Sequence, residues 1–238
     1  MQFLFKDFFN GLLGGRAKGF SANCYGECEN MSSPLTVKRN DYHARPKRSD
    51  VYTPVGVASF LFDTLRFAER CALARPAQFL TVLDPAIGSG RLTNPWYQAG
   101  RTIIGCDVAD VNPACHRLIR GRFEDQERIV PRPDIAICNP PFNGADGKQL
   151  YPEVFLRHAF KLFGDTIPIV LFVPMGFRLN QRRKSTRWRW LRESRAKIAS
   201  IVSLPLDIFP DVEFHAEILI FNVAGLEPHY FLPEEALA

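Results

Sequence analysis

The segment Asn139-Pro140-Pro141-Phe142 has the residue types in this sequence that most directly suggest chemistry. It follows an apolar run at 134–138 that is typical of a buried strand. Each proline biases the residue before it away from helix, so the Asn139 side-chain oxygen and the Pro140 carbonyl can point at one external group. Two such acceptors can hold an amino group with its lone pair localised for attack on an electrophilic methyl group. Phe142 offers a flat face on which a base can stack. The alternative interpretation of the whole segment is a rigid turn after a strand.

A second candidate site is the loop Asp84-Pro85-Ala86-Ile87-Gly88-Ser89-Gly90, which follows the apolar run 79–83. Gly88 and Gly90 permit backbone angles and a close ligand approach that a Cβ would block. The next apolar run ends at Asp107, where nucleoside-binding folds place a carboxylate that accepts hydrogen bonds from ribose hydroxyls. The combination predicts a nucleoside cofactor. Position 93 is Thr where the dinucleotide fingerprint has Gly, and the sequence has no Gly-Lys-Ser/Thr phosphate loop. These two observations disfavour NAD and ATP as the cofactor.

Positive charge is concentrated between residues 178 and 197, where Glu193 is the only acid and Trp188 and Trp190 are interspersed. A basic surface of this kind can follow the phosphates of a nucleic acid. A solvated helix face is the simpler alternative. The candidate contacts are Arg182, Arg183, Lys184 and Arg187.

The remaining sequence predicts a scaffold that places these segments at strand ends. Apolar runs predict strands at 79–83, 102–106, 134–138, 167–173, 198–204 and 217–223. Helical spacing predicts helices at 54–71, 90–99, 151–163 and 186–196. The alternation indicates an α/β domain with a doubly wound, mostly parallel sheet.

Bulk composition places the chain among soluble globular proteins, with 46% hydrophobic and 23% charged residues. The longest apolar run, 167–175, is too short to span a bilayer, and no secretory signal is evident. We therefore expect a cytoplasmic protein without a membrane partner. Cys24 and Cys28 are the only close cysteine pair, and His43 does not complete a zinc site, so no metal is expected.

Taken together, these motifs and their order resemble the gamma-class DNA adenine-N6 methyltransferases, which include modification methylases of restriction–modification systems. The resemblance runs from about residue 51 to 222. Asp84 to Gly90 is similar to the Asp-Pro-Ala-x-Gly-Ser-Gly motif that cradles S-adenosylmethionine (SAM), and Asn139 to Phe142 to the catalytic Asn-Pro-Pro-Tyr/Phe motif. The segment Tyr52-Thr53-Pro54 is similar to the N-terminal motif that lies over the methionine part of SAM.

The resemblance also assigns two phenylalanines. Phe123 falls where the family binds the adenine ring of SAM, although Arg122 stands in place of the usual acid. Phe209, in Asp207-Ile-Phe-Pro210, is similar to the residue that supports the extruded target base. Few residues follow Val223, where the family's target-recognition domain normally lies. This implies recognition through inserted loops, recognition by a separate specificity subunit, or little reading of the DNA sequence.

The resemblance implies a class I, Rossmann-like fold with a seven-stranded sheet in a single domain. The implied boundaries are an N-terminal extension at 1–48, a SAM-dependent methyltransferase domain at 49–225 and a C-terminal tail at 226–238. The implied reaction is methyl transfer from SAM to the N6 amino group of adenine in DNA, with the base extruded. Two alternatives remain: a methyltransferase acting on RNA or a protein glutamine, and a non-catalytic subunit that binds SAM or DNA.

Overall fold

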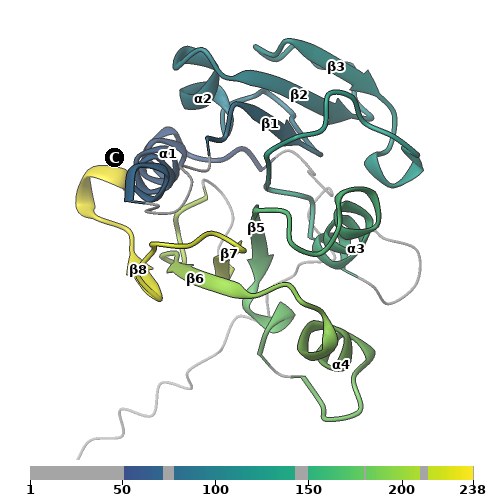
Figure 1. The fold of residues 1–238 in the computed structure, drawn as a ribbon. Coiled ribbons are helices and arrows are strands. Elements are labelled where there is room, and N and C mark those ends of the chain that lie inside the picture. Colours follow the sequence, from purple (N-terminus) through teal and green to yellow (C-terminus); the bar gives the residue numbers. More distant parts are fainter. Residues whose placement is uncertain (1–50, 72–77, 143–149, 180, 210–213, 238) are drawn as a thin grey trace, which may run out of the picture. The chain divides into compact units, whose positions relative to one another are not determined.

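The computed structural model describes residues 51–71, 78–142, 150–179, 181–209 and 214–237 (Figure 1). The expected N-terminal extension, with Cys24, Cys28 and His43, lies outside these residues. None of the helices within the described ranges is long and apolar enough to cross a membrane.

The described residues form one eight-stranded sheet with the order β3-β2-β1-β4-β5-β7-β6-β8. Its strands are β1 (Thr81–Asp84), β2 (Thr102–Asp107), β3 (Arg117–Arg120), β4 (Ile135–Cys138), β5 (Ile169–Pro174), β6 (Ile198–Ser203), β7 (Ala216–Phe221) and β8 (His229–Phe231). Strand β7 is antiparallel to both neighbours, and the other pairs are parallel. The expected α/β, doubly wound, mostly parallel sheet is thereby confirmed.

Strands β3 and β8 were not expected from the sequence. Both lie at sheet edges, are short and carry partly or fully exposed side chains, so neither has the apolar run that marks a buried strand. The sheet has eight strands where seven were expected, because β8 adds a strand by pairing with β6. Strand β8 (His229–Phe231), within the segment expected to be a tail, therefore belongs to the sheet.

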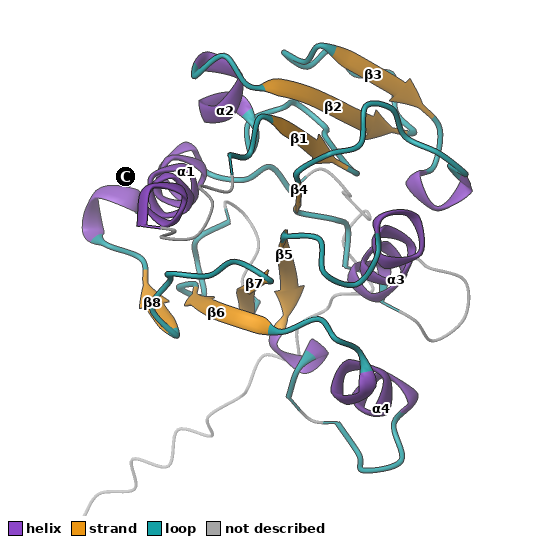
Figure 2. Cartoon of the chain, in the orientation of Figure 1, coloured by secondary structure: helices purple, strands orange, loops and turns teal. Residues whose placement is uncertain are grey.

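Helices cover both faces of the sheet (Figure 2). The helices are α1 (Val55–Cys71), α2 (Asn94–Gln98), α3 (Tyr151–Phe163) and α4 (Thr186–Glu193), with 3₁₀ turns η1 (Phe123–Asp125), η2 (Met175–Phe177) and η3 (Glu234–Ala236). Apolar side chains of α1 and α2 share one core cluster, and those of α3 share a second cluster on the opposite face. The central strands are buried on both faces, which explains their continuous apolar sequences.

The carboxyl ends of β1, β2 and β4 meet at one edge because these strands are parallel neighbours. The chain passes from β1 to β2 on one side, whereas β4 lies on the other side of β1. This arrangement is a topological switch point, the place where doubly wound sheets bind ligands. It brings Asp84, Asp107 and Asn139 to the same edge of the sheet.

Candidate active site

The glycine loop turns sharply away from the end of β1. Gly88 and Gly90 have φ angles of +50° and +76°, a region that strongly favours glycine. A Cβ at Gly90 would also lie 2.9 Å from the Cβ of Pro113, so the loop after β2 packs closely on this turn. Both glycines are therefore required by backbone geometry.

Asp107 ties the glycine loop to the loop after β2. Its Oδ2 accepts a hydrogen bond from the Gly88 N–H, and its Oδ1 accepts one from the Ala109 N–H, both at 2.8 Å. Each carboxylate oxygen has a second lone pair that can accept from a ligand hydroxyl. Asp107 thus has a structural task besides the ribose contact expected from the sequence.

Asp84 is a buried carboxyl group at the end of β1, with 1% of its surface exposed. Burial raises its pKa from 3.8 to about 7, the Ala86 N–H opposes this rise, and the nearby Asp107 adds to it. The hydrogen bond from Ala86 N–H to Asp84 Oδ1 is 3.0 Å long. Burial also raises the pKa of Cys138 well above its usual value, so this thiol remains protonated and is not a nucleophile at neutral pH.

We expect Asp84 to make the ligand-free protein less stable as the pH rises. Because the pKa is about 7 when folded and 3.8 when unfolded, its contribution is fully present below about pH 4 and is lost as the pH approaches 7. The difference corresponds to at most about 4 kcal/mol. Thermal unfolding at pH 5 and pH 8 should show a smaller pH dependence for Asp84→Asn than for wild type. Equal pH dependence in the two proteins would contradict this explanation.

The segment before α1 lies against both candidate loops. Asn139 Nδ2 donates to Thr53 Oγ1 at 3.1 Å and to the Val51 carbonyl at 3.4 Å. Thr53 is 3% exposed, so the hydroxyl holds the Asn139 amide from within the protein. The Tyr52 ring lies beside Gly88, where a Cβ would be 3.4 Å from Tyr52 Cε1. Tyr52 therefore lies next to the glycine loop while Thr53 orients Asn139.

Three aromatic rings are arranged in series next to Asn139. The Phe142 and Phe214 rings meet edge to face, with centroids 4.9 Å apart, and Phe214 stacks on Phe209 at 5.5 Å. Phe209, expected to support a base, is only 2% exposed and packs towards Phe172 in the core. The partly exposed ring nearest Phe142 is instead Phe214, which follows residues that the structure does not describe.

The expected adenine-binding ring is also buried. Phe123 is 1% exposed and packs edge-on against Phe155 and His158. Its ring therefore belongs to the core and does not offer a face to a ligand. Val108, directly after Asp107, is an apolar side chain that is 72% exposed. Val108 was not among the residues expected from the sequence, although it directly follows the acid that ends β2.

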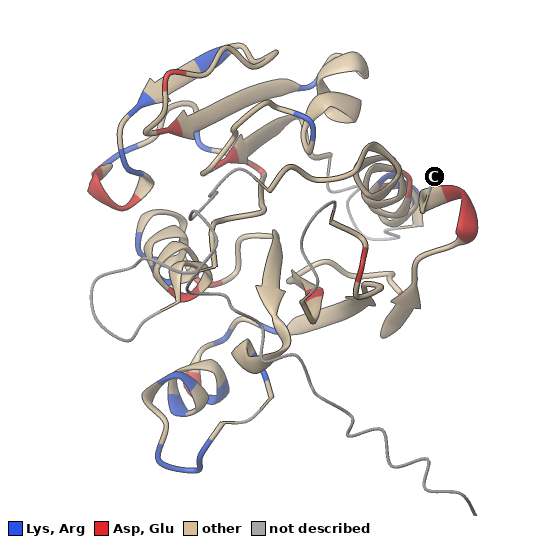
Figure 3. Ribbon diagram, turned by 180° about the vertical axis from the view of Figure 1, so that it is seen from behind, with Lys and Arg blue, Asp and Glu red and all other residues tan. Residues whose placement is uncertain are grey.

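The basic segment separates into two sets of side chains. Arg187 Nε donates to Glu153 Oε2 at 2.7 Å, and Arg178 forms a two-point contact with Glu217, so these arginines are engaged within the protein. Glu153 and Glu217 are 3% and 4% exposed. The exposed set is Arg182, Arg183, Lys184, Arg189, Arg192, Arg195 and Lys197, of which Arg195 pairs with Asp165. Basic positions cluster on α4 and the loop before it (Figure 3). Arg187 is therefore removed from the expected nucleic-acid contacts.

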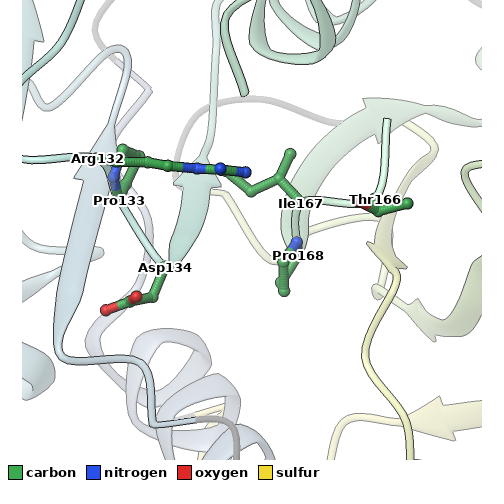
Figure 4. Close-up of a pocket in the computed structure, with 6 residues that line it drawn as sticks. All are labelled: Arg132, Pro133, Asp134, Thr166, Ile167 and Pro168. Atoms are coloured by element: carbon green, nitrogen blue, oxygen red, sulfur yellow. The ribbon is translucent and has the colours of Figure 1, made fainter. Parts of the chain in front are cut away.

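A cavity of about 440 Å³ lies elsewhere in the molecule (Figure 4). It is lined by residues 132–134 and 166–168, which precede β4 and β5. These residues lie at the amino ends of the strands, opposite the edge that holds Asp84 and Asn139. The cavity is therefore separate from the candidate active site.

Solved structures with similar folds include several methyltransferases. A chain of a type I restriction–modification (R-M) system superposes with a TM-score of 0.58 at 21% identity, covering 78% of this chain and 45% of that chain. A modification subunit of a putative type I restriction enzyme from Vibrio vulnificus YJ016 gives 0.56 at 18% identity, covering 78% and 48%. A putative class I SAM-dependent methyltransferase from Listeria monocytogenes gives 0.56 at 15% identity, covering 80% and 68%.

The fold is that of the class I SAM-dependent methyltransferases. No protein-family model matches the sequence, and no curated protein matches it either. The chain spans about half the length of the type I chains that it resembles. In this methyltransferase fold, the carboxyl edge of β1, β2 and β4 is the place where the glycine loop, Asp107 and the Asn139 loop meet.

Proposed function

We propose that this protein is a SAM-dependent methyltransferase that methylates the N6 amino group of adenine in DNA, with the target base extruded from the duplex. The observation that carries the proposal is the hydrogen bond between Thr53 and Asn139. It joins the segment beside the glycine loop to a loop whose oxygen atoms can hold an amino group. A cofactor loop and an amine-binding loop at one sheet edge are the components that methyl transfer needs.

The residues at this edge fit SAM. At Gly88 and Gly90 the absence of a Cβ lets Tyr52 and Pro113 pack closely on the turn, and Asp107 has lone pairs for the ribose hydroxyls. Val108 offers an exposed apolar surface to the adenine ring, and Tyr52 lies next to the methionine side. Pro85, Ala86 and Pro54 shape the two backbone segments. When bound, SAM supplies an electrophilic methyl group.

Asn139 acts on the nucleophile in this proposal. Because its Nδ2 is held by Thr53 and Val51, its Oδ1 is left to accept a hydrogen from the target amine. The Pro140 carbonyl accepts the other hydrogen, and Pro141 keeps Pro140 extended. These bonds strengthen as the nitrogen becomes tetrahedral, so they stabilise the transition state more than the ground state.

Phe142 and Phe214 provide the aromatic surfaces for the extruded base. We expect Phe214→Ala to raise the KM for DNA by roughly five- to a hundred-fold, because base–aromatic stacking contributes about 1–3 kcal/mol. Phe214→Tyr should retain most of the affinity, which separates base stacking from the packing of the ring against Phe142 and Phe209. Steady-state kinetics with a DNA substrate measures the effect. An unchanged KM in Phe214→Ala would exclude this ring from base binding.

Transfer of labelled methyl groups from SAM to DNA, RNA and protein substrates tests the proposed function. Label in DNA that digests to N6-methyl-2'-deoxyadenosine supports it, whereas label in RNA or glutamine supports the alternative acceptors. SAM binding without transfer to any substrate would favour a non-catalytic subunit.

The context that we propose is restriction–modification in the cytoplasm, because type I R-M chains have this fold. A separate specificity subunit would read the DNA sequence. Co-expression with a candidate specificity subunit, followed by mapping of modified bases, tests this part of the proposal.

A further inference from the structure

Helix α4 differs from the other crossover helices because every one of its residues is at least partly exposed. It lies beyond the end of β5 (Figure 1) and begins after a loop that contains Arg182, Arg183 and Lys184. Ser185 caps its first turn by accepting a hydrogen bond from the Trp188 N–H at 3.3 Å. Only Trp190 and Leu191 of this helix pack against the core, so further contacts are needed to fix its position.

Contacts with α3 and with η2 fix the position of α4. On η2, the Arg187 guanidinium donates to the Phe177 carbonyl at 3.2 Å. Glu153 pairs with Arg187 of α4 and also with Arg157, at 2.7 and 2.8 Å. The Arg157 guanidinium lies 4.0 Å from the centre of the Trp190 ring, which also packs against Phe160. Because Glu153 is buried, losing either arginine would leave charge poorly compensated. These contacts hold one face of α4 against the protein.

The opposite face of α4 carries Trp188, Arg189 and Arg192. Trp188 is 42% exposed, and Arg189 and Arg192 are also exposed. Trp188 and Arg192 are four residues apart and therefore share a face of the helix. The Trp190 ring packs on α3, whereas Trp188 leaves a large aromatic surface in solvent among cations.

We propose that the outer face of α4, with Trp188, Arg189 and Arg192 together with Arg182, Arg183 and Lys184, binds an unpaired nucleic-acid strand, and that Trp188 stacks on one of its bases. The inference rests on the proposed function in taking a nucleic acid as the substrate. It adds that the protein contacts a strand whose bases are open, because an indole ring can stack only on a base that has lost a neighbour.

The position of α4 agrees with this role. Glu153 lies in the first turn of α3, and α3 follows β4 and the Asn139 loop in the chain. Helix α4 follows the carboxyl end of β5, which pairs in parallel with β4. The segment that presents the proposed nucleic-acid-binding surface therefore begins at the same sheet edge as the catalytic loop. A membrane-binding helix would need a wide apolar face, whereas Trp188 is the one apolar side chain among the cations of this face.

Binding of a single-stranded oligothymidylate of roughly 12 nucleotides tests the inference, with a duplex of the same length for comparison. Fluorescence anisotropy of the labelled oligonucleotide gives the affinity, and tryptophan fluorescence reports stacking. We expect tighter binding of the single strand, with quenching of Trp188. Trp188→Ala should weaken single-strand binding by about ten- to a hundred-fold and remove the quenching. Trp188→Phe should retain most of the affinity.

Two matched controls separate stacking and charge from general surface effects. Phe231→Ala removes an aromatic side chain that is 76% exposed on β8, and it should leave binding unchanged. Joint replacement of Arg182, Arg183 and Lys184 by Ala should reduce the slope of log affinity against log salt by about 0.7 per lost phosphate contact. Joint replacement of Arg66 and Arg70, exposed on α1, should leave the slope unchanged.

Wild-type affinity in Trp188→Ala would overturn the inference, as would tighter binding of the duplex than of the single strand. Equal, Trp188-dependent binding of polyglutamate or of anionic lipid vesicles would also overturn it. The assay needs neither SAM nor turnover. Failure of methyl transfer with intact Trp188-dependent binding would therefore count against the proposed function alone.

Discussion

Asn139→Ala is expected to reduce methyl transfer by about 10²–10³-fold or more, while the affinity for SAM stays nearly unchanged. Asn139 follows β4, whereas the glycine loop follows β1, so the substitution removes the contact to the target amine and spares the cofactor loop. The lost hydrogen bond is oriented towards a transition state, which explains why kcat should fall rather than only KM rise. Single-turnover methylation and calorimetric SAM binding measure the two quantities.

Thr53 provides a graded companion to this test. Thr53→Val removes the hydroxyl that accepts from Asn139 Nδ2 but keeps the shape of the side chain. We expect a smaller loss of kcat than in Asn139→Ala, with Thr53→Ser close to wild type, because the Val51 carbonyl still holds the amide. Near-normal methylation by Asn139→Ala with SAM bound would reduce the loop to a structural turn and refute the enzymatic proposal.

Asp107→Ala is expected to weaken SAM binding by about 1.5–3 kcal/mol for each ribose hydrogen bond that is lost. The variant also removes the acceptor of the Gly88 and Ala109 N–H groups, so the glycine loop loses its tie to the loop after β2. Both effects lower affinity, and titration calorimetry measures their sum.

Asp110→Ala is the matched control for this prediction. Asp110 lies in the same loop as Asp107. Its carboxylate is fully exposed and pairs with Arg120. Asp110→Ala removes one negative charge, as Asp107→Ala does, but it leaves the hydrogen bond to the glycine loop in place. The affinity for SAM should therefore stay close to wild type. Asp107→Asn should fall between wild type and Asp107→Ala, because the amide oxygen can still accept one hydrogen bond. Unchanged SAM affinity in Asp107→Ala would place the cofactor elsewhere.

The sequence by itself determined the features that depend on neighbours in the chain. Buried strands have continuous apolar sequences, and Gly88 and Gly90 mark a turn with positive φ angles, so the scaffold and the glycine turn were predictable. The short edge strands β3 and β8 were not, because pairing with a neighbouring strand, rather than their own composition, defines them.

Only the tertiary structure decided which side chains are available and which are already engaged. The hydrogen bond from Asn139 to Thr53 joins segments 86 residues apart, and no local pattern encodes it. Phe209 and Phe214 are both aromatic, yet packing against Phe172 buries the first. Arg187 differs from Arg183 because Glu153 of α3 and the Phe177 carbonyl lie next to it. Burial and long-range partners depend on how the whole chain packs, so equivalent residue types acquire different roles.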